Sequence, residues 1–185
     1  CKMTPLLMQV KPIWCCQMGF LFIFAAMYVT HNSLSENAKV WVYPSSRKFY
    51  PQEIDGLKEK LHQFISEWKV NENAFKASFE IKYNRFVIFY AEDNVTLSNA
   101  DIDAQVGCIL ALQQDYDIEL LDKMNVCFKQ GEFIQYKTVK DFKKLLKSKS
   151  VNDKTIVFDN LIQTKYELEN FWEVPITESW YNRFL

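Results

Sequence analysis

The sequence is poor in the residues on which several classes of functional site depend. It contains 4 glycines and 2 histidines among 185 residues. A phosphate-binding loop needs closely spaced glycines, so that backbone N–H groups can approach the phosphates, and neither the G-x-x-x-x-G-K-[ST] nor the G-x-G-x-x-G pattern occurs. A zinc site needs clustered cysteine and histidine ligands, and no C-x-x-C pair is present. We therefore expect no nucleotide cofactor and no metal ion.

Cysteine is also sparse outside the N-terminal segment. Of the 5 cysteines, only Cys108 and Cys127 lie beyond it, each alone in apolar surroundings. This pattern is typical of buried free thiols in a reducing compartment, so we expect a cytoplasmic protein. The net charge of −1 excludes a general attraction to nucleic acid or to an acidic membrane.

The one long hydrophobic run covers residues 13–29, IWCCQMGFLFIFAAMYV. It has three interpretations: a signal peptide, a short membrane anchor, or upstream sequence translated in frame. We favour the third, because the chain begins with Cys1 and because Met27 opens a polar segment that leads into the first expected strand. On this interpretation residues 1–26 are no part of the fold. The net charge of residues 27–185 is then −3, since the segment contains Lys2 and Lys11 and no acid.

From residue 27 onward, the hydrophobic pattern predicts one α+β domain, 27–185. Apolar residues at helical spacing alternate with β-branched and aromatic runs that have strand periodicity. Ser98 with Asp101, and Thr138 with Asp141, have the spacing of a capping box at a helix start. In order, the expected elements are strand 39–43, helix 51–68, strands 75–83 and 86–90, helix 98–116, strands 124–128 and 133–136, helix 138–147 and strand 156–158.

The first six of these elements match the split βαβ, or ferredoxin-like, arrangement. We therefore expect an antiparallel sheet with both long helices on one face. A β-α-β extension and an aromatic tail, expected to be mostly loop from Asp159, follow it.

Several acidic and basic residues are candidates for a site. Asp101 and Asp103 at a helix start favour capping over catalysis. The acidic turn 115–122 favours solvation, with weak binding of a divalent ion as the alternative. The lysine-rich side of helix 138–147 favours a solvated face, with phosphate or RNA contact as the alternative; its lysines, with two neighbours, are Lys140, Lys143, Lys144, Lys147, Lys149 and Lys154.

The tail is the strongest candidate for a functional site. Asp159 and Asn160 directly follow a strand, and Trp172, Trp180 and Arg183 lie within a dozen residues of one another. Charged and aromatic side chains concentrated on irregular backbone indicate function more strongly than core packing does. The alternative is that the tryptophans only hold the tail against the sheet.

Three segments of the chain resemble a known family. They are MYVTHNSLSENAKVWVYPSSRKF at the start, YNRFVIF, and TIVFDNLIQTKYEL with WEVPITESW near the end. Together they resemble a family of short, uncharacterised bacterial proteins that often carry the label "ABC transporter ATPase", and the resemblance covers residues 27–185. The Walker A loop, the Walker B acid and the L-S-G-G-Q signature of such an ATPase are absent, so the resemblance implies no ATPase activity.

The chain also departs from that family at two places. Family members often have Gly-Cys-Ser-Ile-Asp where this chain has residues 99–103, NADID, and Ser-Trp-His where it has Ser179, Trp180 and Tyr181. A catalytic cysteine or histidine at either place would be missing here.

These observations predict a cytoplasmic binding or regulatory module for a protein or peptide partner. Its binding residues would be the tail side chains and an open sheet face; the tail side chains are Trp172, Trp180, Tyr181 and Arg183. The alternative is a small enzyme with a carboxylate-based site, formed by Asp159, Asn160, Arg183 and Asp101. A second alternative is weak nucleic-acid contact through the lysine side of helix 138–147. Contact with a membrane is expected only if residues 1–26 exist in the native protein.

Overall fold

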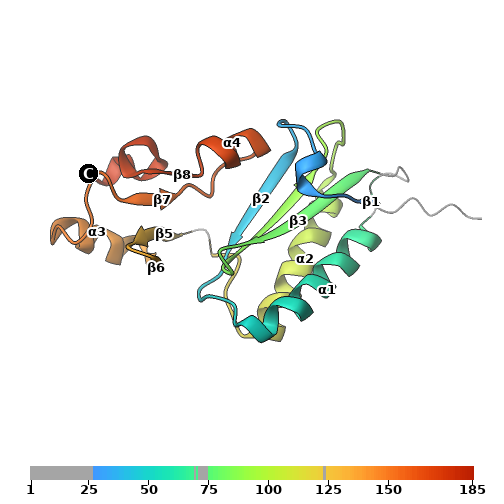
Figure 1. Ribbon diagram of the computed structural model, residues 1–185, viewed down its shortest axis with the longest axis horizontal. Helices are drawn as coiled ribbons and strands as arrows, with labels where there is room; N and C mark the ends of the chain where they lie inside the picture. Colours follow the sequence, from blue (N-terminus) through green and yellow to red (C-terminus); the bar gives the residue numbers. More distant parts are fainter. Residues whose placement is uncertain (1–26, 69, 71–74, 123) are drawn as a thin grey trace, which may run out of the picture.

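A computed structural model describes residues 27–68, 70, 75–122 and 124–185. The three interpretations of the hydrophobic segment depend on residues outside this range. The chain is of the α+β class, as predicted, with two mainly antiparallel sheets and four α-helices in the described part (Figure 1). The strands are β1 Met27–Tyr28, β2 Lys39–Pro44, β3 Lys76–Lys82, β4 Phe86–Ala91, β5 Asn125–Gln130, β6 Phe133–Thr138, β7 Ile156–Phe158 and β8 Glu173–Pro175. The α-helices are α1 Ile54–Glu67, α2 Asn99–Tyr116, α3 Val139–Lys147 and α4 Lys165–Asn170.

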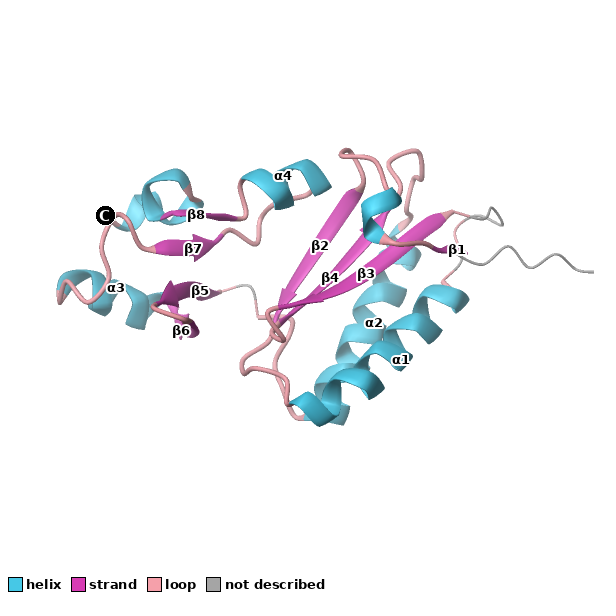
Figure 2. Cartoon of the chain, viewed as in Figure 1, coloured by secondary structure: helices cyan, strands magenta, loops and turns pink. Residues whose placement is uncertain are grey.

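The first sheet has the strand order β1-β3-β4-β2, and α1 and α2 cover one of its faces (Figure 2). Side chains alternate along each strand, so that Ala77 and Phe79 of β3 point toward the helices and pack against Leu61 and Ile65 of α1 within one buried cluster. The expected N-cap at Ser98 is present, because its side chain accepts a hydrogen bond from the N–H of Asp101. This helix-covered face forms the larger core of the molecule.

The ferredoxin-like arrangement itself is not confirmed. β2, β4 and β3 lie side by side in the order expected, but β5 does not join them and pairs instead with β6 and β7 in a second sheet. The edge of β2 that β5 would have covered carries one isolated antiparallel bridge, between Lys39 and Thr164. β5 uses one edge for its hairpin with β6 and the other for β7, so neither edge is left to pair with β2.

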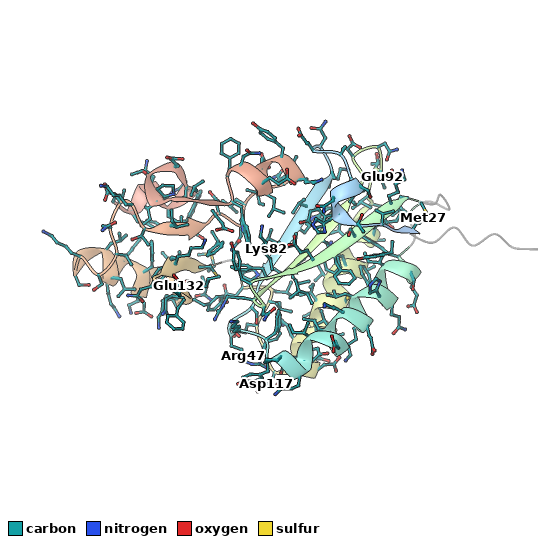
Figure 3. The ribbon with its side chains drawn as sticks, in the orientation of Figure 1. Met27, Arg47, Lys82, Glu92, Asp117 and Glu132 are labelled. Atoms are coloured by element: carbon teal, nitrogen blue, oxygen red, sulfur yellow. The ribbon has the colours of Figure 1, made fainter. Side chains whose placement is uncertain are left out.

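The second sheet, β6-β5-β7-β8, lies beside the first sheet, on the side away from α1 and α2. A buried cluster joins the two sheets, and its centre is the contact among Phe86, Phe158 and Trp172, with ring centroids 4.8 to 4.9 Å apart. Lys82 lies at this junction in Figure 3, and its Nζ is 5.0 Å from the centroid of the Trp172 ring. The sheet face that was expected to be open for a partner is therefore covered.

The far side of the second sheet packs against α3 and the end of the chain. Phe128 of β5, Phe142 of α3 and Tyr181 of the tail form a third buried cluster. The tail is more regular than expected, since it includes α4, β8 and two 3-10 helices at Ile176–Glu178 and Trp180–Phe184. No helix in the described ranges has the length and apolar character needed to cross a bilayer.

Candidate functional site

The lysine side of α3 and the C-terminal tail meet on the surface of the second sheet. The tail reaches this position because the Asp159 carboxylate accepts a hydrogen bond from the N–H of Trp180 at 3.0 Å. Tyr181 then packs against Phe142, with ring centroids 6.0 Å apart. Two elements separated by more than 30 residues along the chain are thus brought side by side.

Two cation–aromatic contacts hold side chains in place where α3 and the tail meet. The Nζ of Lys143 lies 4.2 Å from the centroid of the Phe184 ring, and the Arg183 guanidinium lies 4.2 Å from that of Trp180. Such contacts contribute about 0.5–1 kcal/mol at exposed sites. They also limit where the two charged groups can lie, so that both are held next to the same part of the surface.

A cavity of about 710 Å³ opens between α3 and the tail. Its apolar wall consists of Leu146, Val151 and Phe184, and its other lining residues are Lys143, Lys147, Lys149, Asn152, Arg183 and Leu185. Four of these side chains are cationic, and none forms a salt bridge with another group in the described part of the chain. An unneutralised cluster of this kind beside an apolar wall attracts an anionic ligand that also carries apolar groups.

Lys149 has an unusual backbone for its residue type. Its φ is +56°, in the left-handed region that favours glycine. The N–H of Ser150 bonds to the carbonyl of Leu145, and that of Lys149 to the carbonyl of Leu146, which is the Schellman pattern at the end of α3. Glycine is the usual residue at this position, but the chain places a lysine there, at the rim of the cavity.

The structure assigns the other tail candidates to packing contacts. Asn160 accepts a hydrogen bond from the indole N–H of Trp172 at 2.9 Å, and Asp159 also accepts one from the N–H of Leu161 at 3.2 Å. Trp172 is 1% exposed and Tyr181 is 7% exposed, so neither presents a surface to a partner. Trp180, at 37% exposed, remains accessible.

The residues of the carboxylate-based alternative are not gathered at one cavity. Asp101 caps α2, where its carboxylate accepts hydrogen bonds from the N–H and hydroxyl of Ser98, both at 2.7 Å. Arg183 lines the cavity beside α3, whereas Asn160 lines another cavity next to β2. Within the described residues, no group of three or more histidine, cysteine, aspartate or glutamate side chains could hold a metal ion.

The two cysteines of the domain are unsuited to chemistry at neutral pH. Burial raises the pKa of Cys108 to about 11 and that of Cys127 to about 12. Both thiols are therefore protonated and poor nucleophiles near pH 7.

A second cavity, of about 540 Å³, was not foreseen from the sequence. It lies along the free edge of β2 and is lined by residues 40–43 of that strand and by residues 160–164 on the opposite side. No sequence motif marks this cavity, since it exists only because β5 pairs in the second sheet and not with the edge of β2.

Comparison with models of protein families, with curated proteins and with solved structures finds no match. The resemblance to the family labelled as transporter ATPases is not tested by these comparisons, so it stays a prediction.

Proposed function

We propose that this protein is a binding module whose cavity between α3 and the tail takes an acidic, partly apolar segment of a protein partner. The observation that carries the proposal is the convergence of Lys143, Lys147, Lys149 and Arg183 on one cavity, without a carboxylate paired to any of them in the described part of the chain. Protein partners are recognised through such complementary charge at the rim of an apolar contact.

The lining of the cavity favours a peptide over a simple anion. Leu146, Val151 and Phe184 form an apolar wall large enough to accept an aliphatic side chain. Carboxylates on either side of that side chain would then face Lys147 and Arg183. A free phosphate would use the cations but leave this wall in contact with water.

The structure also favours an acidic protein segment over a nucleic acid. Single-stranded RNA is commonly recognised by aromatic side chains on an open sheet, where the bases stack. Here the inner strands of each sheet are covered on both faces, by α1 and α2, by the cluster between the sheets, and by α3 with the tail; the exposed aromatic side chain of the second sheet, Phe133, lies on its edge strand β6. The cationic groups therefore border a compact hollow and not an open sheet of aromatic side chains; the rings beside them, Trp180 and Phe184, already contact Arg183 and Lys143.

The proposal places the protein in the cytoplasm, in agreement with two free thiols, one buried and one partly buried. Cys108 and Cys127 form no disulfide. A reducing compartment keeps such thiols in this state without further protection.

The experiment measures binding of fluorescently labelled peptides to the full chain by anisotropy, at low and at moderate salt. The probes are a capped Glu-Glu-Leu-Glu-Glu peptide, a capped Lys-Lys-Leu-Lys-Lys peptide and a single-stranded oligouridine. We expect the acidic peptide alone to bind, and its affinity to fall as salt rises, because the attraction is between exposed charges. Tighter binding of the oligouridine than of the acidic peptide would contradict the proposal.

A pair of matched double variants tests the site. Lys147→Ala/Arg183→Ala removes two cations that line the cavity, whereas Lys140→Ala/Lys154→Ala removes two exposed cations that do not. Both change the net charge equally. We expect the first to weaken acidic-peptide binding about fivefold, as for a loss of about 1 kcal/mol, and the second to change it by less than about twofold. Equal effects would mean that net charge, and not this cavity, binds the peptide.

A further inference from the structure

The free edge of β2 and the segment 160–164 form a fork. They are joined at its closed end by the Lys39–Thr164 bridge and by two backbone hydrogen bonds of 2.9 Å, from Val40 N–H to the carbonyl of Gln163 and from Lys165 N–H to that of Ala38. Beyond this point, no backbone hydrogen bond joins the two segments in the described residues. The cavity of about 540 Å³ fills the space where they diverge.

The backbone of β2 points polar groups into this fork. In an antiparallel pair, successive residues direct their N–H and C=O groups alternately toward and away from the partner strand. Val40 donates away from β4, to Gln163, while Ser45 N–H donates to the carbonyl of Arg85 at the end of β4. Val42, two residues after Val40, therefore directs both its N–H and its C=O into the fork, and so does the carbonyl of Val40.

Val40 and Val42 are buried residues, yet these backbone groups face the cavity without a partner in the described part of the chain. Val40 is 3% exposed and Val42 is 5% exposed. Outside the ladder with β4, the described residues show no hydrogen bond to the N–H or C=O of Val42, which the alternation along β2 directs away from β4. Buried backbone groups are almost always paired, because an unpaired one costs free energy comparable to a lost hydrogen bond. The edge is therefore ready to pair with a further strand.

The strand order of the first sheet explains why the position beside β2 is unoccupied along most of its length. In a split βαβ unit, the fourth strand would lie along this edge and complete the sheet. β5 pairs in the second sheet instead. Next to β2, the described chain forms only the bridge between Lys39 and Thr164. The first sheet thus has a strand position that the described chain occupies at one end only.

We propose that this fork binds an extended, uncharged segment of a protein partner, which adds to the edge of β2 as a further strand. Addition of a peptide strand to a free sheet edge draws its affinity from main-chain hydrogen bonds and its specificity from alternate side chains. Those side chains would contact Trp41 on one side of the sheet and Ile162 or Leu161 across the fork, which are apolar surfaces. This inference is independent of the tail cavity and of its acidic partner.

The charge around the fork argues for an uncharged occupant. Among the described residues, the ionisable side chains that line it, apart from the tyrosine of β2, are Lys39 and Asp93, and Asp93 is exposed to solvent. Lys39 is already engaged, since its Nζ donates to the carbonyl of Val95 at 2.5 Å. A charged residue in the middle of the added strand would lose its hydration without a partner.

The fork also favours a peptide over a second copy of this chain. If β2 of two copies paired edge to edge, each edge would carry its own segment 160–164, tied at Val40 and Ala38. The two segments would occupy the space needed by the partner strand. A flexible peptide end has no such obstruction.

The test selects ligands for the full chain from a phage-displayed library of random heptapeptides. The selected peptides are then made synthetically, with capped ends, and their binding is measured by calorimetry. We expect enriched peptides with uncharged, β-branched central residues, and protection of the Val42 amide from hydrogen exchange when they bind. If no peptide is enriched over an unrelated control protein, the proposal is wrong.

Two changes probe the main-chain bonds. Val42→Pro removes the N–H that faces the fork without removing a bond to β4, and proline is tolerated on the outward side of an edge strand. N-methylation of successive peptide residues leaves the protein unchanged, so it remains decisive if the proline variant does not fold. We expect Val42→Pro, and N-methylation at every second residue, to weaken binding about tenfold.

The other outcomes overturn the proposal. Binding that is insensitive to every N-methylation would show side-chain recognition without strand addition. Concentration-dependent protection of the Val42 amide without peptide, together with a dimer in sedimentation, would identify a second copy as the occupant. Selected peptides whose binding is lost in Lys147→Ala/Arg183→Ala and kept in Val42→Pro would belong to the tail cavity, which distinguishes failure here from failure of the proposed function.

Discussion

The indole N–H of Trp172 donates a hydrogen bond of 2.9 Å to the side-chain oxygen of Asn160. Asn160 lies two residues after the end of β7, and Trp172 directly precedes β8, so the bond closes the segment that contains α4. The ring of Trp172 lies between the two sheets, 4.9 Å from the ring centroids of Phe86 and of Phe158. Two residues expected at a binding or catalytic site thus hold the second sheet against the first.

This relationship makes Trp172 the most sensitive tail position for stability. Trp172→Ala would remove a fully buried aromatic ring, and we expect it to lower the free energy of unfolding by about 3–5 kcal/mol. Asn160→Ala would leave the indole N–H without its partner and cost about 1–3 kcal/mol. Urea denaturation measures both. Trp180→Ala is the control, since Trp180 is 37% exposed; a larger loss for this variant than for Trp172→Ala would contradict the assignment.

The strained backbone at Lys149 gives a prediction in which stability and binding change in opposite directions. Lys149→Gly should raise the free energy of unfolding by about 1 kcal/mol, because glycine adopts the positive φ of this position without steric cost. The same variant should weaken binding of the acidic peptide, since it removes a cation from the cavity.

Thermal and urea denaturation, together with anisotropy, measure the two effects of Lys149→Gly. Lys154→Gly is the matched control, because Lys154 does not have a positive φ and does not line the cavity. We expect Lys154→Gly neither to raise the free energy of unfolding nor to change binding of the acidic peptide. If Lys149→Gly destabilised the protein, the assignment of strain at this residue would be wrong.

Alkaline pH should destabilise the fold through its buried acids. Burial raises the pKa of Cys127 to about 12, and those of Tyr43 and Tyr136 also to about 12, from ordinary values near 9 and 10. Below pH 9 both folded and unfolded chains keep these protons. As the pH rises from about 9 toward about 12, the unfolded chain loses them first, so the free energy of unfolding falls.

Urea denaturation at about pH 7 and about pH 10.5 measures this loss, and we expect the lower midpoint at the higher pH. Alkylation of the native protein, mapped by mass spectrometry, provides the control. Cys127 should react only after denaturation, because its thiol is buried and protonated. A midpoint that did not change, with Cys127 labelled in the native protein, would contradict the prediction.

Local sequence patterns predicted most elements because their physical causes are local. The alternation in residues 75–83 produced β3, and the apolar spacing in residues 54–68 produced α1. Ser98 and Thr138 cap α2 and α3 as their spacing indicated. The short strands β1 and β8 were missed, since strands of two or three residues are formed by their neighbours and have no periodicity of their own.

The sequence indicated the two parts of the candidate site, but it did not indicate that they lie side by side. The sequence indicated the lysine side of α3 and the aromatic tail as separate candidates. Their meeting depends on Asp159, which binds the N–H of Trp180, and on Tyr181, which packs on Phe142. Contacts between residues so distant along the chain leave no spacing pattern that could be recognised beforehand.

The sequence by itself determined the α+β class, the position of most helices and strands, and the absence of phosphate-loop and zinc-cluster motifs, because periodicity, capping and ligand spacing are properties of short segments. Only the tertiary structure decided where β5 pairs. A strand can satisfy its backbone groups equally well in either sheet, so the choice rests on long-range packing around Trp172 and on the pairing of β5 with β7. That choice covers the sheet face once expected to be open and leaves the edge of β2 free.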